Sequence, residues 1–139
     1  MMNLSESMSL LAALQLAAVK ASKRLDRCLS LHGISFNEFL ALHFLSEAHL
    51  NTLNRTEIAE YLGITASGAT RLLNPMDKNR LVEKQSNPRD ARVSLVKLTE
   101  TGKQVYKDAF TSFQHSAESM LPEARQYQIE TVLSFLNKL

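Results

Sequence analysis

Three charged side chains meet in a short stretch of the chain, "NPRDAR", at residues 87–92. Arg89 and Arg92 carry guanidinium groups, and Asp90 lies two residues before Arg92. Guanidinium groups at a hairpin tip can enter the minor groove of DNA, where narrow A·T tracts concentrate negative potential. Asp90 can orient Arg92 through a charge-assisted hydrogen bond. The alternative is a solvent-exposed ion pair, which contributes about 0–1 kcal/mol.

A second group of polar side chains recurs at helical spacing between residues 66 and 79. Its members share one face: Ser67, Thr70, Arg71, Asn74 and Lys78. In a major groove, arginine can bond guanine, asparagine can bond adenine, and hydroxyls can reach a base or a phosphate. Thr65 would cap this helix, whose free N–H groups favour a phosphate, and Gly68 would let its backbone approach DNA closely. Any one of these residues could simply be solvated, but the set predicts a recognition helix.

The neighbouring elements must position these residues. Asn54 and Glu57 have the spacing of a capping box, which predicts a short helix that stops at Gly63. A short helix, a tight turn and a second helix form a helix-turn-helix. Two short strands over 82–86 and 93–98 follow, joined by a loop longer than a two-residue hairpin turn. Residues 49–54 are expected to form a loop.

Long apolar helices flank this unit. One is predicted over 5–31 and ended by Gly33, one begins at Ser35, and one begins at Thr99. Pro122 suits the first turn of a final helix. The expected fold is therefore mainly α (α+β), a winged helix-turn-helix with long terminal helices. We assign residues 1–139 to one domain, with long terminal helices over 1–34 and 104–139 and a DNA-binding core over 35–103.

Composition narrows the class of protein. The chain has 139 residues, 45% of them apolar and 22% charged, which suits a folded protein. Net charge is only +2, but residues 55–103 hold nine basic and six acidic groups, so the excess positive charge lies there. One cysteine suits a reducing cytoplasm, and the apolar run near the N-terminus is too short to span a bilayer. We expect a cytoplasmic protein without membrane contact.

Other chemistry is weakly supported. Cys28 follows Arg27, and a thiol near a cation is a candidate oxidant sensor, although a packed thiol is the favoured interpretation. The four histidines lack metal-ligand spacing, so we expect no metal. No nucleophile–base pair or glycine-rich phosphate loop occurs, so we expect neither an enzyme nor a cofactor.

The stretch "EIAEYLGITASGATRLLNPMDKNRLVEKQSNPRDARVSLVKLTETG" resembles the core signature of the multiple-antibiotic-resistance regulator (MarR) family. The resemblance covers residues 53–103 and extends loosely to "HGISFNEFLALHFL". Its most specific part is Asp90-x-Arg92 followed by Leu98-Thr99-x-x-Gly102. The resemblance implies a homodimeric winged-helix repressor or activator on double-stranded DNA, with a near-palindromic operator and a possible small-molecule effector. The resemblance implies that the terminal helices, here 1–34 and 104–139, are dimerisation helices, and that the wing arginine reaches the minor groove.

Three residues depart from the family pattern. Ala91 stands where another arginine is usual, Arg80 replaces a glycine, and Pro75 lies inside the recognition helix. Arg80 must accept a left-handed backbone or change the helix exit, and Pro75 should kink the helix. Together they predict altered specificity or wing angle. Ala91, Pro75 and the low net charge keep one alternative open, a winged-helix protein-interaction module without DNA binding. A third option is a helical ligand-binding dimer.

Overall fold

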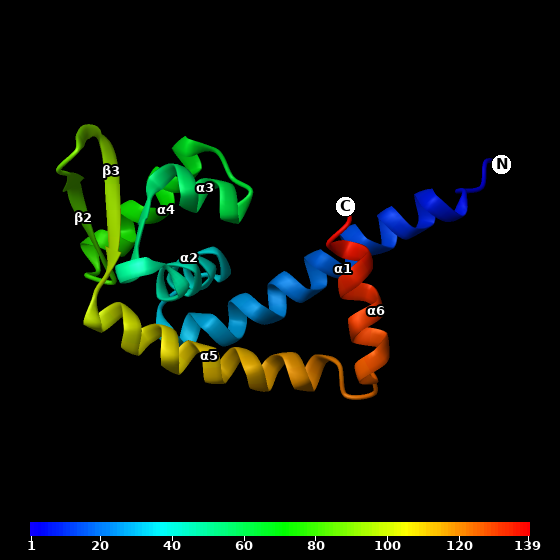
Figure 1. Cartoon of the computed structure of the whole chain (residues 1–139). Helices are drawn as coiled ribbons and strands as arrows, with labels where there is room; N and C mark the ends of the chain where they lie inside the picture. Colours follow the sequence, from blue (N-terminus) through cyan, green and yellow to red (C-terminus); the bar gives the residue numbers. More distant parts are fainter.

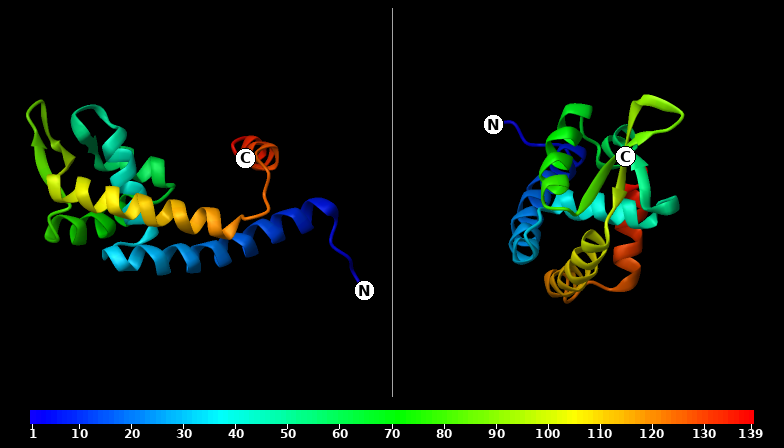
Figure 2. Two further views of the ribbon diagram at one scale, coloured as in Figure 1. Left: turned by 90° about the horizontal axis from the view of Figure 1, so that it is seen from below. Right: turned by 90° about the vertical axis from the view of Figure 1, so that its left-hand side faces the viewer.

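The longest elements of the computed structural model, which describes residues 1–139, are α1 (Glu6–Leu29) and α5 (Glu100–Met120). These two helices lie side by side (Figures 1 and 2). The last helix, α6 (Gln126–Leu136), turns away from α5 and lies near the N-terminal half of α1. Both chain termini therefore lie at one end of the molecule, and the β2–β3 hairpin lies at the other (Figure 1).

The remaining elements form a winged helix-turn-helix. In chain order they are the 3-10 helix η1 (Ser30–His32), α2 (Phe36–Glu47), the 3-10 helix η2 (His49–Asn51), β1 (Thr52–Asn54), α3 (Arg55–Leu62), α4 (Ala66–Lys78), β2 (Val82–Asn87) and β3 (Asp90–Leu98). The three strands form an antiparallel sheet in the order β1-β3-β2. The predicted fold, mainly α with a winged helix-turn-helix between long helices, is confirmed.

One core holds the helix-turn-helix against the sheet and α5. The largest fully buried side chains are Leu29, Leu42, Leu45, Ile58, Leu73, Met76, Val82 and Val96. They come from α1, α2, α3, α4 and the sheet, so burying them fixes α4, the predicted recognition helix, and the β2–β3 wing relative to one another.

Residues 49–54 were expected to form a loop, and this is wrong. They form η2 and then β1, whose Leu53 pairs with Val96 of β3 and is buried. A strand of three residues is too short to show an alternating pattern. Its partner also lies more than forty residues further along the chain, so no local signal marks it.

Three other boundaries differ from the prediction. The first helix ends at Leu29 and continues as η1 before Gly33, which has the left-handed φ of 72° expected of a helix end. The final helix begins at Gln126, and Pro122 lies in the turn before it. The hairpin turn itself comprises only Pro88 and Arg89, because Asn87 already pairs with Asp90.

The hairpin tip is nevertheless irregular. Ser86 pairs with Ser94 and Asn87 pairs with Asp90, so residues 91–93 have no partners on β2. A bulge of this kind bends and twists the strand locally. The extra length that the sequence indicated at this tip therefore lies in β3, around Arg92.

Arg80 takes the left-handed backbone that its position requires, with a φ of 60°. The Leu81 N–H donates to the Met76 carbonyl over 2.9 Å, and the Arg80 N–H donates to the Asp77 carbonyl over 3.0 Å. This pair of bonds is the Schellman ending of a helix, which favours glycine in the left-handed position. The helix end keeps its usual form, and the backbone of Arg80 is strained because a non-glycine residue adopts a left-handed φ.

We expect Arg80→Gly to raise the free energy of unfolding by roughly 0.5–1 kcal/mol, because glycine adopts this backbone without strain. Urea denaturation measures the change. Asn79→Gly is the matched control: its φ of −86° needs no glycine, so it should lower stability. A loss of stability in both variants would contradict the strain assigned to Arg80.

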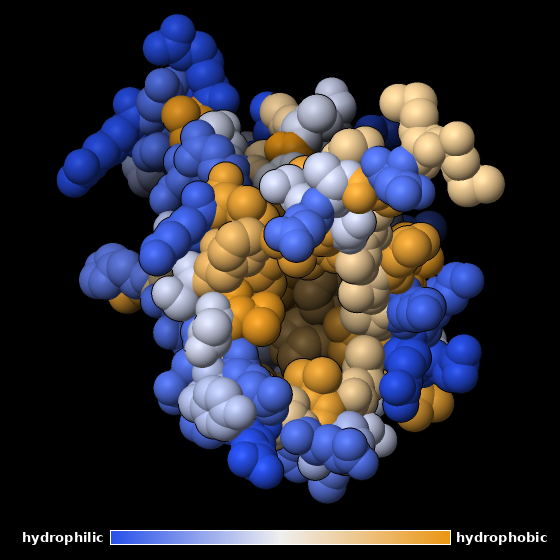
Figure 3. Space-filling model, turned by 90° about the vertical axis from the view of Figure 1, so that its right-hand side faces the viewer, coloured by the Kyte–Doolittle hydropathy of each residue, from blue (hydrophilic) through white to orange (hydrophobic).

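The terminal helices bury little of their apolar surface. Leu29 is the only buried residue of α1, and α6 has none. Leu16 is 64% exposed and Leu133 is 52% exposed. Figure 3 views this end of the molecule and shows hydrophobic side chains around a hollow. One apolar cavity of about 530 Å³ lies between α1 and α6.

The molecule contains no helix with the length and apolar character needed to cross a membrane.

Candidate nucleic-acid interface

Capping hydrogen bonds and a left-handed glycine fix where the two helices of the motif begin and end. The Glu57 N–H donates to Asn54 Oδ1 over 2.7 Å, and the Asn54 N–H donates to Glu57 Oε1 over 3.0 Å, so the predicted capping box is present. Gly63 ends α3 with a φ of 66°. Thr65 Oγ1 then accepts from the Gly68 N–H over 3.0 Å and starts α4. These bonds fix the tight turn that sets α4 against α3.

The predicted recognition face is presented to solvent. Ser67, Arg71, Asn74 and Lys78 are exposed, and Thr70 is half-buried. On the opposite side, Ala69, Leu73 and Met76 are buried in the core. The Arg71 side chain makes no hydrogen bond or ion pair within the chain, so its guanidinium is available to a partner. Pro75 is also exposed, and α4 continues through it as one helix to Lys78.

Gly68 has a local reason to lack a side chain. A Cβ at this position would lie 3.2 Å from Thr65 Oγ1 and 3.6 Å from Ile64 Cβ. The glycine therefore accommodates the hydroxyl that caps α4. This contact accounts for the residue type without DNA, and the close approach of DNA to Gly68 stays a prediction.

Two cations from neighbouring elements hold side chains of the recognition face. Arg55, at the start of α3, donates from Nη1 to Thr70 Oγ1 over 3.0 Å. Lys84, on β2, donates from Nζ to Asn74 Oδ1. The sequence analysis missed both, because the partners are 15 and 10 residues apart and only the fold brings them together. The positive charge around α4 therefore comes from three elements.

At the wing, the predicted link between Asp90 and Arg92 is present. Asp90 Oδ1 accepts from the Arg92 backbone N–H over 3.0 Å and from Nε over 3.2 Å. The Arg92 side chain is 91% exposed, so its remaining N–H groups face solvent. The backbone N–H of Arg92, and then its guanidinium, hold the pKa of Asp90 below its ordinary 3.8. The carboxylate stays charged at neutral pH, and the link weakens only when the pH falls through that lowered pKa.

Arg89 occupies the turn itself. Its backbone N–H donates to Asn87 Oδ1 over 2.9 Å, an Asx turn that shapes the tip. Its guanidinium has no partner within the chain and is exposed. Arg89 and Arg92 therefore both project from the tip, while Ala91 between them adds no charge.

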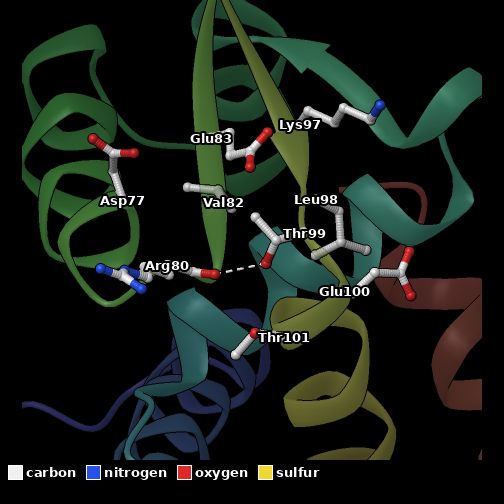
Figure 4. Close-up of a pocket in the computed structure, with 9 residues that line it drawn as sticks. All are labelled: Asp77, Arg80, Val82, Glu83, Lys97, Leu98, Thr99, Glu100 and Thr101. Carbon is white, nitrogen blue, oxygen red and sulfur yellow. Dashed lines mark hydrogen bonds between the residues drawn. The ribbon is translucent and has the colours of Figure 1, made fainter.

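The base of the wing is fixed to the start of α5. Thr99 Oγ1 donates to the Arg80 carbonyl over 2.6 Å (Figure 4). It also contacts the Leu81 carbonyl at 3.0 Å. At Gly102 an added Cβ would lie 2.1 Å from the Leu81 carbonyl oxygen, so only glycine fits. The Thr99 and Gly102 of the "LTxxG" motif thus hold α5 against the segment between α4 and β2. An open cavity of about 610 Å³ borders this junction.

Two histidines connect the winged part to α5. His43 Nδ1 lies 2.8 Å from Tyr106 Oη, and His32 Nε2 lies 2.7 Å from Ser112 Oγ. Phe39 of α2 also stacks with Phe113 of α5, their ring centroids 5.2 Å apart. These contacts couple the helix-turn-helix to the long helix.

Cys28 is half-buried at the end of α1 and packs against the core cluster. Its surroundings agree with the favoured interpretation of a packed thiol. Oxidant sensing by Cys28 stays a prediction, tested by whether dilute peroxide acts on a Cys28→Ser chain as it does on the natural one.

The helix-turn-helix and the two-stranded wing after it define the chain as a winged helix-turn-helix protein. The family model "MarR family" matches residues 32–93, from the end of η1 to β3. The chain is 30% identical over 89 residues, 60% of its length, to an uncharacterized HTH-type transcriptional regulator, YfiV, of Bacillus subtilis. The match spans 56% of YfiV, so the chain corresponds to just over half of that relative.

Solved structures share the fold along nearly the whole chain. Sco3205, a MarR family transcriptional regulator from Streptomyces coelicolor in complex with DNA, superposes with a TM-score of 0.87 at 21% identity, covering 99% of this chain and 88% of that one. A mutant MarR from E. coli complexed with operator DNA gives a TM-score of 0.86 at 23% identity, covering 96% and 94%. The chain therefore resembles MarR family transcriptional regulators in sequence over residues 32–93 and in fold along nearly its whole length.

Proposed function

We propose that this protein binds double-stranded DNA sequence-specifically as a homodimer and acts as a ligand-responsive repressor. The observation that carries the proposal is the exposed face of α4, beside a wing whose tip presents Arg89 and Arg92. Arginines, an amide and hydroxyls are the side chains that a major groove and its phosphates select. The structures of Sco3205 and the mutant MarR, each solved with DNA, support this assignment by analogy of fold.

Dimer formation is supported by the terminal helices. Their apolar side chains would stay in water in a single chain, which is unfavourable for a contiguous patch of this kind. A second copy of the same end would cover them and fill the cavity between α1 and α6. Two recognition helices would then face successive major grooves of a near-palindromic operator, about one helical turn apart.

Response to an effector is supported by the coupling of α2 to α5. His43 and Tyr106 join the winged part to a helix of the proposed dimer, and His32 and Ser112 do the same near η1. A small molecule bound between these parts would change the separation of the two recognition helices. The DNA would then be released, because both half-sites could no longer be contacted together.

Arg71→Ala should weaken binding to the preferred duplex by about 1–3 kcal/mol and relax base preference at one position of each half-site. The reason is that Arg71 is exposed, has no partner within the chain and lies on the second turn of α4. Fluorescence anisotropy on duplexes with single base changes measures both effects. Equal losses on every sequence would assign Arg71 to a phosphate instead.

Selection from a library of randomised duplexes tests the proposal as a whole. We expect the protein to enrich a near-palindromic sequence with two half-sites. A protein that enriches nothing, even at low salt, would not be the sequence-specific regulator proposed here.

A further inference from the structure

One side chain of the recognition face is held in a defined orientation by the wing. Asn74 is exposed on the third turn of α4, and the ammonium group of Lys84 on β2 donates to its Oδ1. An ammonium group has donors and no acceptor, so the oxygen of the Asn74 amide must be the atom that faces Lys84. The amide NH₂ group is then the part left free for DNA.

This orientation decides which base suits Asn74. Asparagine reads adenine by accepting from N6–H with Oδ1 while donating to N7. Here Lys84 occupies the oxygen and places a positive charge where the adenine amino group would have to come. Guanine presents only acceptors, N7 and O6, to the major groove, and the free Asn74 NH₂ group can donate to them.

We infer that Asn74, oriented by Lys84, selects guanine over adenine in each half-site. Asn74 is the contacting residue and Lys84 the positioning residue. This inference rests on the proposed DNA binding, and it replaces the adenine contact that the residue type alone suggests.

A neighbouring residue supports the same interpretation. The Thr70 hydroxyl contacts the Ala66 carbonyl at 3.2 Å and accepts from Arg55 Nη1 over 3.0 Å. Its only proton is therefore used within the helix, and a cation covers one of its acceptor sites. At both Thr70 and Asn74 a neighbouring cation engages the acceptor oxygen. This edge of the recognition face therefore presents mainly donors, which match guanine.

The test is selection from a randomised duplex library, followed by anisotropy on duplexes differing at one base pair. The base pair contacted by Asn74 is defined as the position at which the Asn74→Ala variant loses the base preference that the natural protein shows. We expect the natural protein to prefer G over A there by roughly tenfold, and Lys84→Met to reduce that ratio to about twofold or reverse it. Lys84→Arg should keep the preference, because a guanidinium also only donates.

Control variants separate positioning from simple loss of charge. Lys107→Met removes an exposed lysine from α5 and should leave the ratio unchanged. In a chain that already carries Asn74→Ala, Lys84→Met should no longer alter the ratio of binding to G over A. Two outcomes overturn the inference alone: a preference for adenine at this position, or a Lys84→Met loss that is equal on all sequences. Selection that enriches no sequence would instead overturn the proposed function, and this inference with it.

Discussion

A chain carrying both Leu10→Glu and Leu133→Glu is expected to be monomeric and to bind its operator roughly 100-fold or more weakly than the natural chain. Both leucines are about half exposed, at 50% and 52%, and both lie on the terminal helices. In the proposed dimer each substitution would bury a carboxylate, which is unfavourable without a partner. In the monomer the same side chains stay in water, so the winged part should keep its stability.

The loss of affinity follows from the loss of one half-site. A dimer binds the second half-site at a high effective concentration, and a monomer gains nothing from it. Sedimentation measures whether the mass falls from a dimer to the 15.6 kDa chain. Leu50→Glu is the matched control, because Leu50 is 73% exposed but lies in η2, outside the terminal helices. A double variant that stays dimeric with unchanged affinity would place the interface elsewhere.

Arg92→Ala is expected to weaken operator binding by roughly ten- to hundredfold, the range for losing hydrogen bonds from a charged group. Its guanidinium is exposed, and Asp90 already orients it, so little conformational freedom is lost on binding. The effect should be largest on operators with an A·T-rich minor groove beside the half-site. Anisotropy on two operators that differ only in this flank measures it.

Two further variants serve as comparisons for Arg92→Ala. Asp90→Asn keeps an oxygen for the Arg92 backbone N–H but loses its charge, so it should cause a smaller loss than Arg92→Ala. Arg24→Ala removes an exposed arginine from α1 and should have little effect. Unchanged binding by Arg92→Ala would mean that the wing tip remains in solvent.

The sequence predicted the features of this fold that depend on residues close together in the chain. The capping box of Asn54 and Glu57, the cap at Thr65 and the link from Asp90 to Arg92 each join residues two or three positions apart. Their spacing alone carries the physical signal. The order of the elements followed from the helix starts and ends that these residues indicate.

Features that depend on distant residues could not be predicted in this way. β1 exists because three residues pair with β3, and Lys84 reaches Asn74 because the wing folds back beside α4. Arg55 reaches Thr70 across the turn between α3 and α4. The chemistry of an asparagine suggested adenine, but its tertiary neighbour changes which of its atoms can face DNA. The candidate residues were therefore chosen from the sequence, while the base preference proposed for Asn74 needed the fold.

The central claim is sequence-specific DNA binding, and one titration tests it most directly. Fluorescence anisotropy would compare DNA from upstream of the protein's own gene with a scrambled duplex of equal composition, across a series of salt concentrations. We expect tighter binding to the upstream DNA, with an affinity that falls by about 0.9 log units per log unit of salt for each phosphate contacted. No binding to either duplex at low salt would contradict the claim and favour a winged-helix module that binds proteins instead.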